Sequence, residues 1–237
     1  MNRVLHQIAL ALALGASATA SHADVVLTTG PYDNGASGQL GEIGTDAISF
    51  SAFGQTFSAL GSTLNSFTLY ATFGVGSTSF KSYLYAWDGQ KIVGSALYTS
   101  AVQEYVSAPG ITPFTFDTGG TALTSGGQYV AFFSTIGAGG GSDGSFWMPL
   151  STPYADGATV FADLNFNDDG PASNGNFSTL LNSPWRQGNG DVMFSASFAN
   201  AENSVPEPGS LALVSFALAG MASCAWRPKN GRHCIGK

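Results

Sequence analysis

Apolar and polar residues alternate along several short segments in the middle of the chain. In residues 65–73, the odd positions from Phe67 to Phe73 are apolar, and the even positions from Ser66 to Thr72 carry hydroxyl groups. Successive side chains of a β-strand point to opposite faces, so this pattern predicts a strand with one face in a core and one in water. We expect the face from Phe67 to Phe73 to be the buried one.

Further segments of strand-like composition are separated by turns rich in glycine and asparagine. They are residues 48–57, 81–87, 90–93, 114–116, 129–135, 158–164 and 192–198. Asp88-Gly89 offers the positive φ angles of a tight hairpin, and we expect Trp87 beside it to lie in the core. No long run has helical spacing, and there is no room for parallel crossovers. The fold class expected for residues 24–204 is therefore all-β, an antiparallel β-sandwich of jelly-roll type without helices.

Histidine and cysteine occur only near the two ends of the chain. They are His6, His22, His233, Cys224 and Cys234. The stretch from Asp24 to Ser204 therefore has no imidazole base, no thiol nucleophile, no disulfide and no zinc ligand of the Cys or His type. Carboxylate chemistry, oxygen-ligated metals and the absence of any chemistry remain open for this stretch.

The middle of the chain is strongly acidic. Residues 24–204 contain 14 Asp and Glu residues but only 3 Lys and Arg residues, so their formal charge is −11. Nucleic acid is excluded as a partner, because binding to phosphate needs Lys and Arg.

Residues 1–23 have the composition of an export signal that forms an N-terminal helix. Arg3 provides a positively charged start, residues 8–14 form a short apolar run, and small residues follow. Cleavage patterns end at Ala20 and at Ala23, and we expect cleavage after Ala23. The alternative is an uncleaved N-terminal anchor, for which the apolar run is short.

Residues 209–226 form a second apolar stretch, which contains no charged residue. As a helix it would rise about 27 Å, close to the ~30 Å hydrocarbon core, so we expect a transmembrane helix. The tail 227–237 follows with the basic residues Arg227, Lys229, Arg232 and Lys237. Positive charge holds that end in the cytoplasm and leaves residues 24–204 on the far side of the membrane.

The segment before this stretch reads Val205-Pro206-Glu207-Pro208, and its two prolines favour an extended peptide. One interpretation is an ordinary membrane anchor after a proline-containing stalk. The order of motif 205–208, apolar helix and basic tail also resembles the PEP-CTERM sorting signal of Gram-negative bacteria, over residues 205–237. That resemblance implies export, an inner-membrane intermediate, and processing by an exosortase, a transpeptidase-like membrane enzyme. It further implies delivery to the cell surface or to an exopolysaccharide matrix.

Short motifs of the middle region, such as Tyr85-Ala-Trp-Asp-Gly89, are similar to those of the sandwich ectodomains found upstream of such signals. This likeness implies a fold more than an activity.

A polar run from residue 163 to residue 170 provides alternating oxygen-bearing side chains, which suit calcium. The candidate ligands are Asp163, Asn165, Asn167 and Asp169. The run departs from an EF-hand loop at Asp168, where the turn favours glycine, and at Asn174, where a bidentate Glu is expected. A solvated loop is the other interpretation, so calcium is the one possible cofactor.

Sugar binding needs aromatic side chains beside hydrogen-bonding groups. The loop-like surroundings of Trp147, Tyr154 and Trp185 make them the candidates, with a lid over the sandwich as the structural alternative for each. Glycosidase chemistry would need two carboxyl groups about 5 to 10 Å apart. Its candidates are Glu104, Asp156, Asp163, Asp168 and Asp169.

Together these features predict a signal peptide (1–23), an ectodomain (24–204) and a sorting signal (205–237). We expect an exported, non-catalytic surface or matrix protein with a structural or adhesive role. Its expected partners are the export machinery, the exosortase, the membrane before processing, and exopolysaccharide. A carbohydrate-binding or calcium-dependent adhesion module is one alternative, and a carboxylate-dependent glycoside hydrolase is another.

Overall fold

The computed structural model describes residues 24–30, 32–38, 42–43, 50–138, 144–151, 154–162, 176–188 and 190–199. The export signal 1–23, the sorting signal 205–237 and the calcium candidates Asp163, Asn165, Asn167 and Asp169 lie outside these residues. Within the described ranges, no helix is long and apolar enough to cross a membrane.

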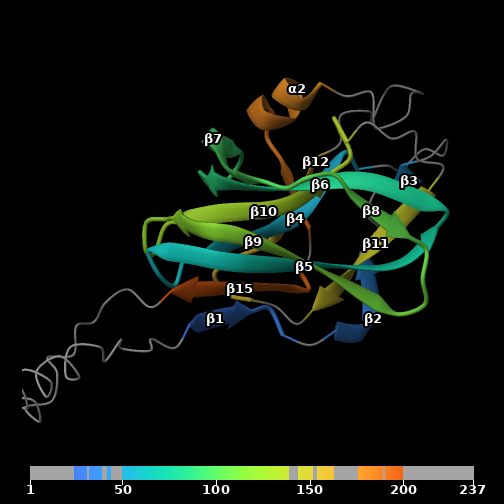
Figure 1. Ribbon diagram of the computed structural model, residues 1–237, viewed down its shortest axis with the longest axis horizontal. Helices are drawn as coiled ribbons and strands as arrows, with labels where there is room; N and C mark the ends of the chain where they lie inside the picture. The colour runs from blue at the N-terminus through green and yellow to red at the C-terminus, as the bar shows by residue number, and fades with distance from the viewer. Residues whose placement is uncertain are drawn as a thin grey trace, which may run out of the picture. The chain divides into compact units, whose positions relative to one another are not determined.

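The strands form two antiparallel sheets (Figure 1). The eight-stranded sheet has the order β1-β15-β5-β11-β14; β9 also pairs with β5, and β2 and β3 pair with β11. Its strands are β1 (Val25–Thr28), β2 (Tyr32–Gly38), β3 (Glu42–Ile43), β5 (Thr63–Val75), β9 (Ile111–Ala122), β11 (Gly144–Ser151), β14 (Asp191–Val192) and β15 (Phe194–Ala199).

The seven-stranded sheet has the order β13-β12-β4-β10-β6-β7, and β8 also pairs with β6. Its strands are β4 (Ala52–Ser58), β6 (Ser77–Trp87), β7 (Ile92–Thr99), β8 (Gln103–Val106), β10 (Gln128–Ser134), β12 (Thr159–Ala162) and β13 (Arg186–Gln187). The prediction of an all-β, antiparallel sandwich is therefore confirmed for the described part of the chain.

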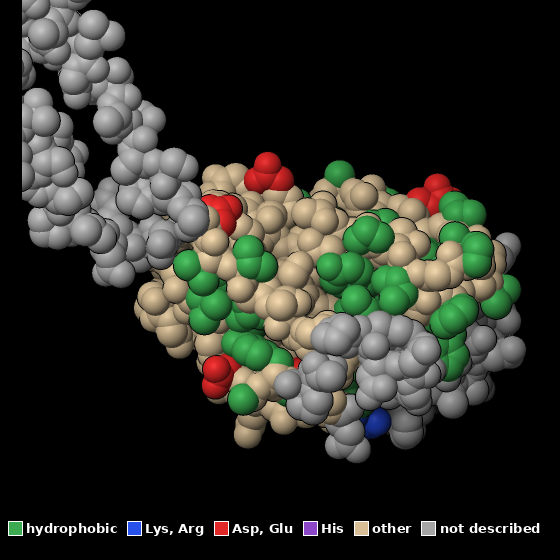
Figure 2. All heavy atoms as spheres, turned by 90° about the horizontal axis from the view of Figure 1, so that it is seen from below, with side chains coloured by type: hydrophobic (Ala, Val, Ile, Leu, Met, Phe, Trp, Pro, Cys, Tyr) green, Lys and Arg blue, Asp and Glu red, His purple; other side chains and the backbone are tan. Residues whose placement is uncertain are grey.

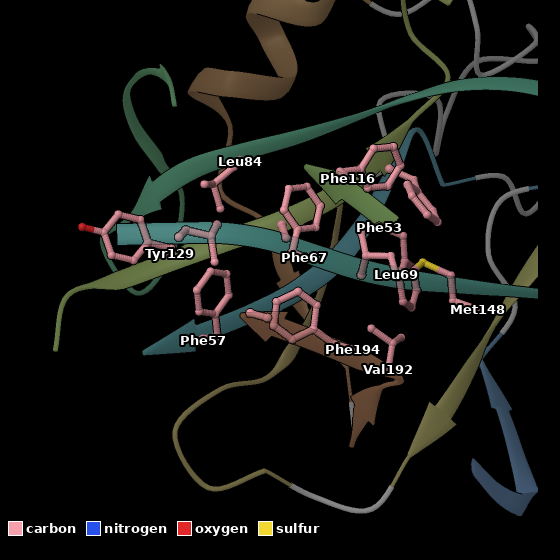
Figure 3. Close-up of a cluster of buried hydrophobic side chains, with 14 of the residues drawn as sticks. Phe53, Phe57, Phe67, Leu69, Leu84, Phe116, Tyr129, Met148, Val192 and Phe194 are labelled. Carbon is pink, nitrogen blue, oxygen red and sulfur yellow. The ribbon is translucent and has the colours of Figure 1, made fainter. Parts of the chain in front are cut away.

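Aromatic rings fill the space between the two sheets (Figure 3). Phe57 of β4 lies with its ring centroid 5.0 Å from that of Phe194 of β15, and Phe80 of β6 lies 5.3 Å from Phe146 of β11. Each of these contacts joins one sheet to the other. Burying one such ring contributes about 1.5–3 kcal/mol to folding, so these pairs stabilise the sandwich.

The alternation in residues 65–73 becomes the middle of β5, with one exception. Phe67, Leu69 and Ala71 are buried in the core as predicted, but Phe73 is exposed over 56% of its surface. The pairing of β5 with β11 shifts at this point, since Phe146 lies opposite Gly74 and Trp147 opposite Thr72. Phe73 is the extra residue of this β-bulge and has φ +32°. The prediction that Phe73 faces the core is wrong because a bulge breaks the period of two.

Strand β10 is buried on both faces. Tyr129, Ala131 and Phe133 point into the core between the sheets, whereas Val130 and Phe132 belong to a second apolar cluster. This second cluster lies on the outer face of the seven-stranded sheet. It explains why residues 129–133 read as a continuous apolar run instead of an alternating one.

A short helix, α2 (Phe177–Asn182), covers this outer face (Figure 1). Phe177, Leu180 and Leu181, spaced three and four residues apart, belong to the second cluster or pack against it. The Asn176 side chain caps the helix by accepting a hydrogen bond of 2.9 Å from the Ser178 N–H. The expectation that residues 24–204 contain no helix is therefore wrong for these six residues.

The hairpin between β6 and β7 forms where Asp88-Gly89 predicts it. Gly89 has φ +101°, and the Asp88 carboxylate accepts hydrogen bonds from the N–H groups of Gln90 (2.9 Å) and Lys91 (2.8 Å). These two bonds, Lys91 first, lower the pKa of Asp88. Trp87, at the end of β6, is buried as predicted.

Candidate binding surface

A row of four hydroxyl side chains crosses the outer face of the eight-stranded sheet. Thr28 of β1 pairs with Ser195 of β15, Ser195 with Thr68 of β5, and Thr68 with Thr115 of β9. Residues paired in register point to the same face, so the four hydroxyl groups form a line across the strands. The Thr68 and Thr115 Oγ1 atoms lie 2.8 Å apart and share a hydrogen bond.

A second row lies two residues further along each strand. It consists of Val26, Ser197, Ser66 and Asp117 on β1, β15, β5 and β9. The Ser197 hydroxyl donates a hydrogen bond of 2.8 Å to the carboxylate of Asp24, at the start of the described chain. The carboxylates near this row therefore lie on the edge strand β9 and beside the first residue of β1. The middle of the face is uncharged.

Towards the other end of β5 the same face becomes aromatic and apolar. Tyr70 pairs with Pro113 of β9, and Thr72 pairs on its two sides with Ile111 of β9 and Trp147 of β11. Phe146 and Met148 point into the core, so Trp147 between them points outward. Tyr70 and Trp147 are both half-buried. They are diagonal neighbours, a relation that separates residues by about 7–8 Å in a sheet.

The bulge at Phe73 extends this apolar region to the end of β5. Gly74 points inward, because a Cβ atom there would lie 2.6 Å from the Tyr105 ring. Val75 therefore points outward, and its surface is 69% exposed. The end of the strand is held to neighbouring loops by a hydrogen bond of 2.8 Å from the Thr72 hydroxyl to the Gly110 carbonyl. A second, of 3.0 Å, runs from the Ser107 N–H to the Gly76 carbonyl.

Figure 2 shows the molecule from the side on which β1 and β15 lie in Figure 1. In this view the acidic side chains stand apart from one another, and Lys or Arg surface appears only at the lower rim. The described Lys and Arg residues all belong to the seven-stranded sheet or its hairpin: Lys81 in β6, Lys91 after β6 and Arg186 in β13. The outer face of the eight-stranded sheet thus combines hydroxyl rows with aromatic side chains and receives no cation from these residues.

The three aromatic residues predicted for sugar binding do not come together. Trp147 is in strand β11 and not in a loop, on the face just described. Trp185 belongs to the second apolar cluster on the opposite side of the sandwich. Its indole N–H donates a hydrogen bond of 3.1 Å to the Leu180 carbonyl, and its ring contacts Trp87 and Phe132. It packs as part of the cover formed with α2.

Tyr154, the third candidate, lies half-buried in the turn before β12. Burial raises the pKa of its hydroxyl. Its backbone N–H donates a hydrogen bond of 2.5 Å to the Asp191 carboxylate.

Asp191 takes part in a buried polar link between the two sheets. The Gln55 side chain in β4 donates a hydrogen bond to the carboxylate of Asp191 in β14 and accepts one of 3.0 Å from the Val192 N–H. Gln55 and Asp191 are 0% and 2% exposed, so neither can reach a large ligand. Because donors occupy both carboxylate oxygens of Asp191, this cluster serves to hold the sheets together.

The carboxylates considered for hydrolysis lie apart where the structure describes them. Glu104 in β8 is paired with Ser79 at the start of β6, and the backbone of Asp156 lies beside Ser58 at the end of β4. These positions flank opposite ends of β10, whose seven residues extend roughly 20 Å. Asp163, Asp168 and Asp169 lie outside the described residues. Among the residues in view, no three His, Cys, Asp or Glu side chains form a metal-binding group.

Tyr70 is the residue of this surface that sequence reasoning missed as a binding candidate. Its place among Ser66, Thr68 and Thr72 put it correctly on the polar face of the strand. The sequence does contain a signal for it. Tyr70 is an aromatic residue within a run of hydroxyl side chains, on the strand face that points away from the core.

Comparisons with known proteins do not name a family. No family model matches the sequence, and no curated protein matches it. A chain from the solved structure of infectious bursal disease virus Gx strain is 13% identical, with a TM-score of 0.28, over 86% of this chain and 51% of that one. This chain spans about half the length of the viral chain, and at that TM-score the likeness supports no conclusion about fold or function.

Proposed function

We propose that this protein is an exported, non-catalytic surface or matrix protein that adheres to exopolysaccharide, and that its sandwich is of the jelly-roll type. The observation that carries the adhesive role is the hydroxyl row Thr28–Ser195–Thr68–Thr115 on the outer face of the eight-stranded sheet. The uncharged middle of this face contrasts with the formal charge of −11 over residues 24–204.

A hydroxyl row suits a polymeric ligand. Each hydrogen bond exchanged with water contributes only about 0.5–1.5 kcal/mol, so a single sugar would gain little from one row. A polysaccharide repeats its hydroxyl groups and can meet several rows at once. Many weak contacts along one chain then add up to adhesion.

The sequence supports a route to the matrix. In this proposal the export machinery recognises residues 1–23, and residues 209–226 hold the protein in the inner membrane. The exosortase then recognises Val205-Pro206-Glu207-Pro208, while the basic tail 227–237 stays in the cytoplasm. Processing delivers the ectodomain to the cell surface or to the extracellular matrix of a Gram-negative bacterium.

Cell fractionation tests this route. We expect the full chain to reach the surface or matrix fraction, and a variant with Pro206→Ala and Pro208→Ala to remain in the inner membrane. A chain with Pro184→Ala, outside the motif, is the matched control and should be sorted normally. An unchanged distribution of the double variant would remove the assignment of residues 205–208.

The calcium site stays a prediction from Asp163, Asn165, Asn167 and Asp169. Calcium titration with a melting readout tests it, because a ligand that binds only the folded state raises Tm with its concentration. The expected result is a rise that is lost in an Asp163→Asn and Asp169→Asn variant. No rise up to millimolar calcium would eliminate the site.

A further inference from the structure

We infer that the ligand of the outer face is a neutral polysaccharide whose chain lies along β5, with sugar rings stacked on Tyr70 and Trp147. The inference rests on the proposed adhesion to exopolysaccharide and names the class of polymer and the residues that recognise it. It is drawn from the division of this sheet face into two halves. The aromatic half lies around Tyr70 and Trp147, and the hydroxyl half lies around Thr68 and Ser195.

The aromatic half matches the apolar faces of sugar rings. Tyr70 and Trp147 are half-buried, so the sheet fixes their positions while part of each side chain meets solvent. Ile111, 36% exposed, flanks Thr72 on the side away from Trp147, and Thr72 between them is fully buried. The C–H groups on the faces of β-linked pyranose rings pack against such surfaces, and fixed side chains lose little entropy on binding.

The hydroxyl half matches the edges of the same rings. From Tyr70 the even positions of β5 continue through Thr68 to Ser66, a distance of roughly 14 Å. Thr68 itself is buried, at 9% exposure, but its neighbours Ser195 and Thr115 keep some exposure to solvent. A polymer that stacks on Tyr70 and continues along β5 therefore passes over the side chains of Ser195, Thr115 and Ser66, which keep some exposure.

Charge selects a neutral polymer over an anionic one. The charged groups described near this face are the carboxylates of Asp24 and Asp117. Lys81, Lys91 and Arg186 belong to the other sheet or its hairpin. A uronic acid polymer would bring its own carboxylates towards these acidic groups, and this repulsion disfavours it.

The composition of the face also favours a polysaccharide over a second copy of this chain. The centre of the face consists of Ser66, Thr68, Ser195 and Ser197. Serine and threonine are under-represented among the residues that dominate protein–protein binding energy. Two copies facing each other would also bring Asp117 and Asp24 of one near those of the other.

A binding assay on the purified full-length protein tests the inference. The probes are insoluble neutral polymers (cellulose, curdlan and chitin), with alginate and polygalacturonate as the anionic comparison. We expect binding to at least one neutral polymer and at least tenfold weaker binding to the anionic ones. Trp147→Ala and Tyr70→Ala should each weaken binding to that polymer about tenfold. Trp147→Phe, which keeps a ring, should retain most of it.

Val102→Ala is the matched control, because Val102 is an exposed apolar residue (47%) between β7 and β8, away from this face. Its binding should equal that of the unaltered protein. Melting curves of all variants establish that each is folded, so a loss of binding reports on the surface. Ser195→Ala, which removes a hydroxyl group of a half-buried residue in the row, should weaken binding about threefold.

Three results of the binding assay would each overturn the inference. They are no binding to any neutral polymer, equal binding by the folded alanine variants, and tighter binding to the anionic polymers. A dimer in solution that Tyr70→Ala converts to a monomer would also overturn it, because this face would then be a self-association surface.

Fractionation separates this inference from the proposed function. Delivery to the matrix without binding to neutral polymers contradicts only the inference, whereas binding by a protein that remains in the cytosol contradicts the proposed route.

Discussion

The two outer faces of the sandwich differ in what covers them. On the seven-stranded sheet, Tyr83, Tyr85 and Phe132 form an apolar face, and α2 with Trp185 packs over it. On the eight-stranded sheet, Thr68 and Ser195 form a hydroxyl face whose neighbours Thr28 and Thr115 are exposed. The same fold therefore has one aromatic face closed by its own chain and one hydroxyl face that stays accessible at Thr28, Ser195 and Thr115, although Thr68 is buried.

Side-chain chemistry explains this difference. Covering an aromatic ring contributes about 1.5–3 kcal/mol, enough to offset the cost of ordering a short segment such as residues 176–188. Burying a hydroxyl group that has no hydrogen-bond partner costs about 1–3 kcal/mol. Packing another segment over the hydroxyl row would therefore not stabilise the folded state.

The largest expected effect is on the closed face. Trp185→Ala removes the ring contacts with Trp87 and Phe132 and the hydrogen bond to Leu180. We expect it to lower the free energy of unfolding by about 3–5 kcal/mol, measured by urea unfolding. Trp147→Ala, on the open face, is the matched variant and should cost less than half as much. Equal losses of unfolding free energy in the two variants would mean that the open face stabilises the fold as much as the closed face does.

Alkaline pH should also weaken the closed face. Burial, and then the neighbouring Tyr85, raises the pKa of Tyr83 to about 12. In the unfolded chain this hydroxyl ionises near pH 10, so between pH 10 and 12 the unfolded state binds fewer protons and gains stability. The free energy of unfolding should fall by about 1–2 kcal/mol, less than the full linkage value because the hydroxyl keeps part of its hydration.

Unfolding curves at intervals from pH 9 to pH 12 measure this fall. In Tyr83→Phe the fall should be smaller, with Tyr85 accounting for part of what remains, because burial raises its pKa as well. The same slope in the variant and in the unaltered protein would assign the effect to other groups.

The third effect is a gain in stability on the open face. Phe73 is exposed and has φ +32°, a conformation that costs a side chain about 1–2 kcal/mol and glycine almost nothing. Phe73→Gly should therefore raise the free energy of unfolding by about 1 kcal/mol. Phe73→Ala keeps the strain and is the control. A loss of stability in Phe73→Gly would show that the exposed ring contributes more than the strain costs.

The smallest expected effect is that of Thr68→Val. It removes the hydrogen bond with Thr115, whose hydroxyl is exposed and can bind water instead. We expect a change in the free energy of unfolding of about 0.5 kcal/mol or less. A larger loss, measured by thermal unfolding, would assign this hydroxyl row a role in stability.

Some of these features follow from neighbours in the sequence. The alternation that ends at Phe73 predicted which residues of β5 share a face, and Asp88-Gly89 predicted the hairpin. The bulge was not predictable, because it arises from the pairing of Gly74 and Thr72 with residues of β11. The helix α2 over the seven-stranded sheet was not predicted either. It has only six residues, too few to be stable alone, and it depends on the apolar face on which it packs.

The candidate surface was predicted in part. Trp147 was identified as an aromatic candidate, but Tyr70 and Ile111, which lie on the same sheet face, are distant from it in the sequence. Trp185 was grouped with it although the two residues lie on opposite sides of the sandwich.

Local sequence determined the all-β class and the hydroxyl character of one strand face, because the period of two along a strand acts between adjacent residues. Only the tertiary structure decided that Thr28, Thr68, Thr115 and Ser195 form one row. It also decided that Trp147 lies on the same face as this row and that Trp185 closes the opposite face. Strand pairing set these relations, because it brings together residues from 47 (Thr68 and Thr115) to 167 (Thr28 and Ser195) positions apart, which no local pattern can specify.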